Sequence, residues 1–267
     1  MKNWIYLRLS FCLFLATILM LNCKKTESDF TKKSTQNFTI SVAAAANLRD
    51  VLEELKQIYM KENPDKKVEI TFGSSGLLVQ QILNGAPFDL FLSADSSFPD
   101  KLKSKNKTSG NSEIYTFGKV ALWSSKANVS KGLKLILNPE IKKIAIANPD
   151  LAPYGKNTVE ALKKMGIYSQ IENKIVWAEN INQSAQFAST GNADIAFIAL
   201  SNAKNKGMMT RGNFYELSAS ECLPIAQSGI VLKSKNQTEA KDFFDFIKSK
   251  KASQTWEKYG YQTKISK

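Results

Sequence analysis

The sequence predicts an α/β fold of two domains joined twice, each with a mixed, mainly parallel sheet that carries helices on both faces. Two observations support this prediction. Short apolar segments alternate with segments whose apolar residues recur at helical spacing, and the alternation runs in two series that divide near residue 117. A chain of 267 residues is also long enough for two domains of ordinary size.

The first series contains three strand–helix units. In order, we predict a strand at 38–44, a helix at 48–59, a strand at 68–72, a helix at 77–83, a strand at 88–92 and a helix at 99–102. Asn47 stands in the N-cap position of the first helix, and Asp95 caps the third. Residues 73–76 (GSSG) form a tight turn before the second helix. Helical connections between successive strands favour parallel pairing.

The second series begins with a long strand pattern. In order, we predict a strand at 114–124, a strand at 144–147, a helix at 154–165, a strand at 175–178, a helix at 181–190, a strand at 195–200, a strand at 223–232 and a helix at 240–247. The segment 195–200 (IAFIAL) is apolar throughout, which is typical of a central strand.

The chain is expected to pass between the two domains near 117–118 and to return near 224–228. We therefore expect a first lobe at 37–117 and 228–267, a second lobe at 118–227, and a hinge of two strands. A cleft between two hinged lobes is a natural ligand site, because groups from both sides can surround the ligand.

The composition excludes several classes of site. The chain has no histidine and three cysteines, so it can hold no Ser-His-Asp or Cys-His catalytic group, no His-containing zinc site and no disulfide framework. The formal net charge is +13 and comes from scattered lysines, with arginine only at Arg8, Arg49 and Arg211. Nucleic-acid binders cluster their positive charge and read base edges with arginine, so we expect no nucleic-acid partner.

The N-terminus predicts export. A basic n-region precedes an apolar stretch at 9–21, which is too short to cross a bilayer comfortably and ends at Asn22-Cys23. The segment resembles a lipoprotein signal peptide at 1–22, with Cys23 as the lipidated first residue and 23–36 as a flexible tether. The expected product is a membrane-anchored lipoprotein of the periplasm or cell surface. The alternative is an uncleaved N-terminal anchor.

Small or polar residues begin four of the predicted helices directly after a strand. These starts are Ala46-Asn47, Ser74-Ser75-Gly76, Tyr154-Gly155 and Glu179-Asn180-Ile181. Such turns lie at the carboxyl ends of strands, where open α/β sheets bind ligands, and a helix start presents free N–H groups to an anion. Asn47 and Ser75 add side-chain donors. Each start alone is most often an ordinary N-cap, whereas four together favour an anion site.

The same turns carry a family resemblance. The stretches FTISVAAAANL at 38–48, ITFGSSG at 70–76 and GAPFDLFLSAD at 85–95 resemble those of the periplasmic molybdate-binding proteins of ABC transporters. Three later stretches also resemble this family: Asn148-Pro149 with Ala152-Pro153-Tyr154-Gly155, Glu179-Asn180-Ile181, and Tyr259-Gly260-Tyr261. The resemblance covers about residues 37–263, and GAPFDLFLSAD is its most specific part.

The resemblance implies a two-domain periplasmic-binding-protein fold (type II, Venus-flytrap) that closes on one tetrahedral oxyanion. By motif position, Asn47 and Ser75 would donate hydrogen bonds from the first lobe, and Tyr154 and Ile181 would donate backbone N–H groups from the second. Ala46 is a weaker candidate through its backbone. Some members place a ligating tyrosine where this chain has Ala199, so Ala199 lacks that contact and is also a weaker candidate.

Elementary chemistry agrees with these expectations. A dianion in a closed cleft needs a hydrogen bond for each oxygen, since burying it unpaired costs too much. Donors at fixed positions also select by size, because a smaller anion such as sulfate leaves donors unpaired at about 1–3 kcal/mol each. Size does not separate molybdate from tungstate.

The resemblance therefore implies high-affinity binding of molybdate and tungstate and their delivery to an ABC transporter permease with its ATPase. We expect a monomer with no enzymatic activity, no cofactor and no directly ligated metal cation, the molybdenum being bound as its oxyanion. Three alternatives stay open at this stage: a binding protein for sulfate or phosphate, an exported enzyme on the same fold, and a lipoprotein adhesin or structural protein. The absence of histidine speaks against the enzyme.

Overall fold

The computed structural model describes residues 38–263, which lie in one compact unit. The predicted signal peptide, the tether and Cys23 lie outside the described residues. In the described part of the chain, no helix is both long enough and apolar enough to cross a membrane.

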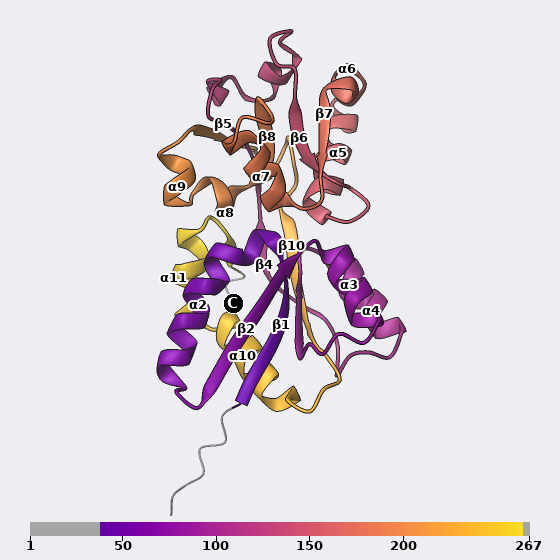
Figure 1. Ribbon diagram of the computed structural model, residues 1–267, viewed down its shortest axis with the longest axis vertical. Helices are drawn as coiled ribbons and strands as arrows, with labels where there is room; N and C mark the ends of the chain where they lie inside the picture. The colour runs from indigo at the N-terminus through magenta and orange to yellow at the C-terminus, as the bar shows by residue number, and fades with distance from the viewer. Residues whose placement is uncertain (1–37, 264–267) are drawn as a thin grey trace, which may run out of the picture. The chain divides into compact units, whose positions relative to one another are not determined.

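Two separate sheets define two lobes (Figure 1). The sheet of the first lobe has the strand order β11-β4-β10-β3-β1-β2. Its strands are β1 (Phe38–Ala45), β2 (Lys66–Gly73), β3 (Leu90–Ser93), β4 (Glu113–Gly118), β10 (Ile225–Val231) and β11 (Gln262–Thr263). The sheet of the second lobe has the order β7-β6-β8-β5-β9. Its strands are β5 (Val120–Ser124), β6 (Ile144–Ala147), β7 (Ile175–Ala178), β8 (Ile195–Ala199) and β9 (Asn213–Glu216).

Helices cover both faces of the first sheet, because alternate residues of a strand face opposite sides. Val42 packs in the cluster that holds α2 and α10, whereas its neighbour Ala43 packs with Leu78 and Leu102 of α3 and α4. The helices of this lobe are η1 (Ala46–Leu48), α2 (Arg49–Glu62), α3 (Ser75–Leu83), α4 (Ser97–Ser104), α10 (Gln237–Lys248) and α11 (Lys250–Lys258).

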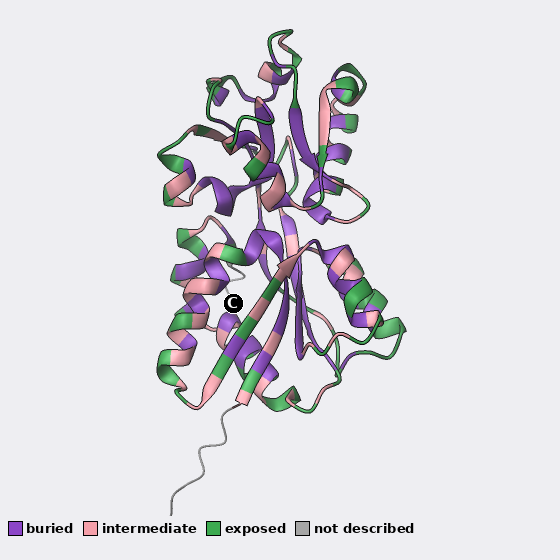
Figure 2. Cartoon of the chain, in the orientation of Figure 1, coloured by how far each residue is buried: buried purple, intermediate pink, exposed green. Residues whose placement is uncertain are grey.

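The second sheet is covered in the same way. Leu122 packs on the side of α5 and η2, and its neighbour Trp123 packs on the side of α7 and α8. The helices of this lobe are η2 (Val129–Leu137), α5 (Pro153–Lys164), α6 (Tyr168–Ile171), η3 (Glu172–Lys174), α7 (Ile181–Ser189), α8 (Leu200–Ala203) and α9 (Lys206–Met209). The central strand β8 is buried along its whole length, as its apolar sequence predicts (Figure 2).

The chain crosses between the sheets at two places. The expected single strand at 114–124 is two strands, since β4 pairs with β10 in one sheet and β5 pairs with β8 in the other. Lys119 separates them, and the chain passes there from one sheet to the other. The chain returns through 217–224, and β10 begins at Ile225, three residues before the expected boundary at 228.

Parallel pairing does not predominate, although both sheets are mixed as expected. Of the nine pairings between the described strands, four are parallel and five are antiparallel. The antiparallel pairings all involve β10, β11 or β5, the strands next to the crossings and at the end of the described chain.

Some helices and strands were not predicted from the sequence pattern. The tail that follows α10 is a further helix, α11, which buries Trp256 and ends before the short strand β11. The strand β9 and the helix η2 were not expected either. Strand β9 is an edge strand with no buried residue, so it lacks the apolar alternation by which a strand is recognised.

Candidate functional site

A small cavity lies where the two lobes meet. It is lined by residues from both lobes: Ala45, Ala46, Asn47, Gly73, Ser74, Ser75, Ala94, Ala152, Pro153, Tyr154, Asn180 and Ile181. The structure thus brings together the four predicted residues Asn47, Ser75, Tyr154 and Ile181, together with the weaker candidate Ala46. Ala199 is fully buried at the end of β8 and is not among the lining residues.

Helix starts build this cavity. The segments η1, α3 and α7 follow β1, β2 and β7 within two residues, and α5 follows β6 after a short loop. These four strands pair in parallel, two in each sheet, so their carboxyl ends point toward the same region. The first N–H groups of a helix have no carbonyl one turn earlier to bond with, which leaves them for a ligand.

The start of α3 contributes a hydroxyl whose oxygen is held in place by a hydrogen bond. The Ala94 N–H donates to Ser75 Oγ at 3.2 Å, so the hydroxyl proton of Ser75 is free to point elsewhere. Next to it, the Gly76 N–H donates across the lobes to the Leu151 carbonyl at 2.9 Å. The bonds from the Ala94 and Gly76 N–H groups therefore fix the turn around Ser75, and its hydroxyl proton remains available to a ligand.

The start of α5 is pressed against the end of β6. A Cβ atom added at Gly155 would lie 2.0 Å from the Ala147 carbonyl oxygen, so only glycine permits this approach. The packing fixes the adjacent Tyr154, whose N–H lies in the first turn of the helix. Proline at N1 supports the same start, because it has no N–H to leave unpaired.

The start of α7 shows how one N–H is left over. Asn180 is the N-cap, and its Oδ1 accepts hydrogen bonds from the N–H groups of Asn182 and Gln183 at 3.0 and 3.1 Å. The N–H of Ile181, which comes directly before these two in the sequence, does not bond to the Asn180 side chain. The predicted donor at Ile181 is thus the first-turn N–H that the capping side chain does not use.

The expectation that Asn47 caps α2 is wrong. Asn47 lies inside the short helix η1, and the N-cap of α2 is Leu48. The Asn47 side chain instead points into a buried polar network, where Nδ2 donates to Gln227 Oε1 at 2.8 Å and to Tyr261 OH at 3.0 Å. Its two amide protons are therefore already engaged, and the backbone N–H is the donor that Asn47 can offer the cavity.

This network joins the lobes behind the cavity. The Asn47 carbonyl accepts hydrogen bonds from Tyr261 OH at 2.7 Å and from Ser201 Oγ at 2.9 Å, and Ser201 belongs to the second lobe. The Asn47 amide also approaches Tyr154 OH at 3.4 Å. These contacts hold the lobes together around a cavity of only about 10 Å³, about the room that one water molecule needs.

The site is electrically neutral apart from its helix dipoles. No lining residue is charged, and the nearby Arg49 lies over the Phe72 ring at 4.5 Å instead. Burial raises the pKa of the Tyr154 phenol well above its usual value, and burial raises that of Tyr261 as well. Both phenols therefore stay uncharged at neutral pH, so an anion in the cavity meets no negative side chain.

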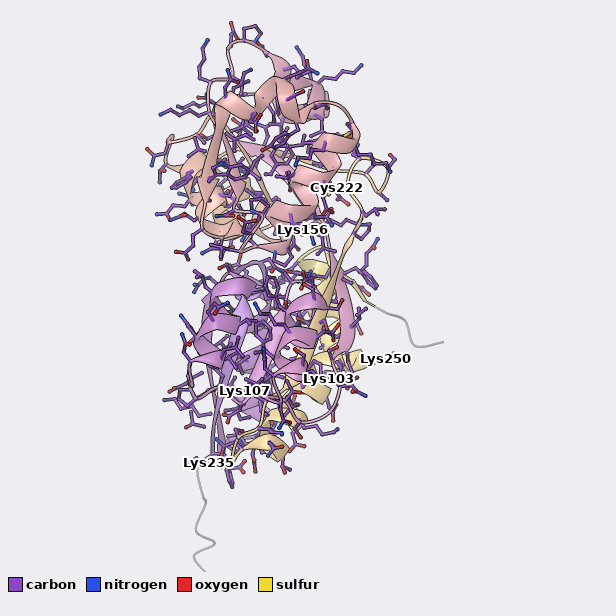
Figure 3. The ribbon with its side chains drawn as sticks, turned by 90° about the vertical axis from the view of Figure 1, so that its right-hand side faces the viewer. Lys103, Lys107, Lys156, Cys222, Lys235 and Lys250 are labelled. Atoms are coloured by element: carbon purple, nitrogen blue, oxygen red, sulfur yellow. The ribbon has the colours of Figure 1, made fainter. Side chains whose placement is uncertain are left out.

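The other residues with reactive groups have structural partners. Asp89 Oδ2 accepts the Ser41 N–H at 2.8 Å, and Asp95 Oδ1 accepts the Phe98 N–H in the first turn of α4 at 3.3 Å, although the N-cap of that helix is Ser96 and not the expected Asp95. Cys222, labelled in Figure 3, lies beside α5, where its Sγ donates to Asn157 Oδ1 at 3.1 Å. Burial, with a contribution from the Glu221 carboxylate, raises the pKa of the Cys222 thiol to about 11, so it is an unreactive thiol.

Sequence reasoning missed the residues that support the site. Gln227 and Ser201 are more than 150 positions from Asn47, so no local spacing could place them beside it. Tyr261 was quoted for the family resemblance, but its contact with Asn47 was not predicted. Ser74 was quoted in the turn that carries Ser75, but the pattern could not tell which serine faces the cavity, and the structure places both in its lining.

Comparisons with known proteins give concordant matches. The family model for bacterial extracellular solute-binding proteins matches residues 40–262. A protein of Azotobacter vinelandii named molybdate-binding protein ModA is 35% identical over 225 residues, which make up 83% of this chain and 89% of the relative. A protein of Rhodobacter capsulatus with the same name is 34% identical over 226 residues, 84% of this chain and 88% of the relative.

A solved structure agrees at the level of the fold. The periplasmic molybdate-binding protein of Azotobacter vinelandii superposes with a TM-score of 0.79 at 30% identity, covering 84% of this chain and 99% of that chain. The two-lobe arrangement described above is therefore shared with a protein whose name states that it binds molybdate.

Proposed function

This chain belongs to the bacterial extracellular solute-binding protein family, and we propose that it binds one molybdate ion between its lobes and delivers it to an ABC transporter permease with its ATPase. The cavity formed by four helix starts, with no charged side chain in its lining, is the observation that supports this function. The two relatives are named as binding proteins, which favours binding over catalysis.

Neutral donors suit a fully deprotonated oxyanion. The proposed donors are the N–H groups of Asn47, Ser75, Tyr154 and Ile181 and the hydroxyl of Ser75. Charge-assisted hydrogen bonds from such donors can offset the desolvation of a dianion without a neighbouring cation. The arrangement also predicts selectivity, because phosphate carries a proton at neutral pH and the lining has no carboxylate to accept it.

The size of the anion is the second basis on which the site selects its ligand. Sulfate is smaller than molybdate and leaves some of the fixed donors unpaired, each at about 1–3 kcal/mol. Tungstate is nearly the same size as molybdate, and we propose that the site binds both. Because the cavity is small in this conformation, the ligand enters when the lobes separate about the two crossings at Lys119 and 217–224.

A thermal-shift experiment with four anions tests this function. A ligand present at a hundredfold excess over its Kd stabilises the folded protein by about 2.7 kcal/mol, which raises the melting temperature by roughly 5–11 °C for a chain of this size. Molybdate and tungstate are expected to do so at micromolar concentration, and sulfate and phosphate to do little at millimolar concentration. The difference should persist in high salt, because a buried site is poorly screened.

The same experiment can reject the proposal. Equal shifts with all four anions that vanish in high salt would mean diffuse binding to surface lysines, which lie on both lobes (Figure 3). Ser75→Ala sharpens the result, since loss of one hydrogen bond to a charged ligand weakens binding by about 10- to 150-fold. Ser130→Ala, at an exposed position whose hydroxyl is not in the cavity, is the matched control.

The N-terminal region supports a proposal about location. We propose that signal peptide 1–22 is removed, that Cys23 carries a lipid, and that 23–36 tethers an exported, monomeric binding protein to the membrane. We also propose that the two lobes, expected at 37–117 with 228–267 and at 118–227, act as hinged halves, with β10 from Ile225 onward belonging to the first. The support is the basic n-region, the apolar stretch that ends at Asn22-Cys23, and the polar tether.

Membrane fractionation of a Cys23→Ser variant tests the lipid anchor. The variant is expected to appear in the soluble fraction and to bind molybdate as the wild type does, because the substitution lies outside the lobes. An intact, uncleaved Cys23→Ser chain that stays with the membrane would favour the uncleaved anchor instead. Size-exclusion chromatography of the soluble variant should give the mass of a single chain.

A further inference from the structure

Ser74 occupies a helix-capping position that it does not use. It is the N-cap residue of α3, with extended backbone angles of φ −67° and ψ 143°. Serine at an N-cap ordinarily accepts a hydrogen bond from the second or third N–H of the helix. Ser74 makes no such bond. The second N–H belongs to Gly76, and it donates instead to the Leu151 carbonyl of the other lobe at 2.9 Å.

The Ser74 hydroxyl is also buried without a partner. The residue is 2% exposed, and Oγ has no hydrogen bond among the described residues. A buried hydroxyl without a partner costs about 1–3 kcal/mol, so natural proteins retain very few. Alanine at this position would avoid that cost. The serine is therefore expected to have a partner in some other state of the protein.

The position of Ser74 indicates what that partner is. Ser74 lines the same cavity as Ser75, Tyr154 and Ile181. No lining side chain is a carboxylate that its proton could reach. A negatively charged oxygen in this cavity is an acceptor of the kind that a buried hydroxyl needs.

We propose that the Ser74 hydroxyl donates a hydrogen bond to the bound oxyanion and is a further determinant of affinity, beside the Ser75 hydroxyl. This inference rests on the proposed function. The two adjacent serines then differ in whether the hydroxyl has a hydrogen-bond partner before the ligand binds. Ser75 Oγ is oriented in advance by the Ala94 N–H, whereas Ser74 gains its partner only when the ligand binds. Ser74 should thus contribute to affinity while it slightly destabilises the ligand-free protein.

Isothermal titration with molybdate tests the proposal on three chains: the wild type, Ser74→Ala and Ser228→Ala. Loss of a hydrogen bond to a charged ligand is expected to raise the Kd of Ser74→Ala by about 10- to 150-fold. Ser228 is the matched control, because its Oγ is likewise buried without a partner but lies in β10 and outside the cavity lining. Ser228→Ala should keep the wild-type Kd.

The melting temperature without ligand separates ligand binding from a structural role. Both serine-to-alanine variants are expected to melt at the wild-type temperature or above it, because each removes a buried hydroxyl that has no partner. Ser74→Gly also lacks the hydroxyl, and glycine is tolerated at an N-cap, so it should show the same loss of affinity. A clear fall in the ligand-free melting temperature of both Ser74 variants would show that the hydroxyl stabilises the fold and would overturn the proposal.

Two outcomes of the titration distinguish the inference from the function on which it rests. If the wild type binds molybdate and Ser74→Ala binds with the same Kd, Ser74 has no part in binding while the proposed function stands. If the wild type itself does not bind molybdate, both are overturned.

Discussion

Replacing Gly155 with alanine shows how tightly the start of α5 is fixed. The new Cβ would lie 2.0 Å from the Ala147 carbonyl oxygen and 2.6 Å from its carbon, and real Cβ atoms essentially never come closer than 3.0 Å. The obstacle is the backbone of β6 in the middle of a buried sheet and cannot rotate away. The first turn of α5 must therefore move by about 1 Å, the difference between 2.0 and 3.0 Å.

This displacement has two consequences of predictable size. Overpacking of this kind costs about 1–3 kcal/mol, which lowers the melting temperature by roughly 2–12 °C for a chain of this length. The Tyr154 N–H moves with the helix, and a hydrogen bond lengthened by about 1 Å is effectively lost. Molybdate binding should then weaken by about 10- to 150-fold, as for any hydrogen bond to a charged ligand.

Titration calorimetry and thermal melting measure both effects on the same protein samples. Gly73→Ala is the control, because Gly73 also lines the cavity but its added Cβ would meet only the Leu78 side chain at 3.4 Å. That variant should melt close to the wild type, so it is the control for the effect on stability. If Gly155→Ala keeps both the wild-type melting temperature and the wild-type Kd, the contact with Ala147 does not position α5.

Three further substitutions give expected outcomes of different kinds. Asn47→Ala should lower the free energy of unfolding of the ligand-free protein by about 1–3 kcal/mol in denaturant titrations, because Gln227 Oε1 loses its buried donor. An unchanged free energy of unfolding would show that this hydrogen bond does not stabilise the fold. Asp194 accepts two backbone N–H groups at 2.9 Å; burial raises its pKa, but these bonds together with the charges of Lys126 and Lys143 lower it overall. Asp194→Asn should therefore cost about 1 kcal/mol at pH 7, and the difference from the wild type should shrink as the pH falls below about 4. Burial raises the pKa of the Cys222 thiol from 9.0 to about 11, so this group contributes stability below pH 9 that is lost as the pH rises toward 11. The unfolding free energy of Cys222→Ala should therefore fall less than that of the wild type between these pH values, by up to about 2–3 kcal/mol. Equal falls for the two proteins would refute this.

The sequence by itself determined the elements that surround the cavity. The strand at the start of the chain, the turn GSSG and the helix starts at 154 and 181 could be predicted, because each depends on local apolar spacing and on small or polar residues at strand ends. The lining of the cavity follows from these elements, since the carboxyl ends of parallel strands face the same edge of a sheet. The helix starts that contain Asn47, Ser75, Tyr154 and Ile181 were found in this way, and the family resemblance singled out these four residues within them.

Only the tertiary structure decided what each side chain does there. The strand pattern at 114–124 is continuous in sequence, but its two halves pair with β10 and β8 in different lobes. Asn47 was expected to cap a helix, but contacts with Gln227 and Tyr261 engage its amide. Helix periodicity and capping depend on neighbours within about one turn. Partners more than a hundred residues away are set by how the two lobes pack, and no spacing in the sequence encodes them.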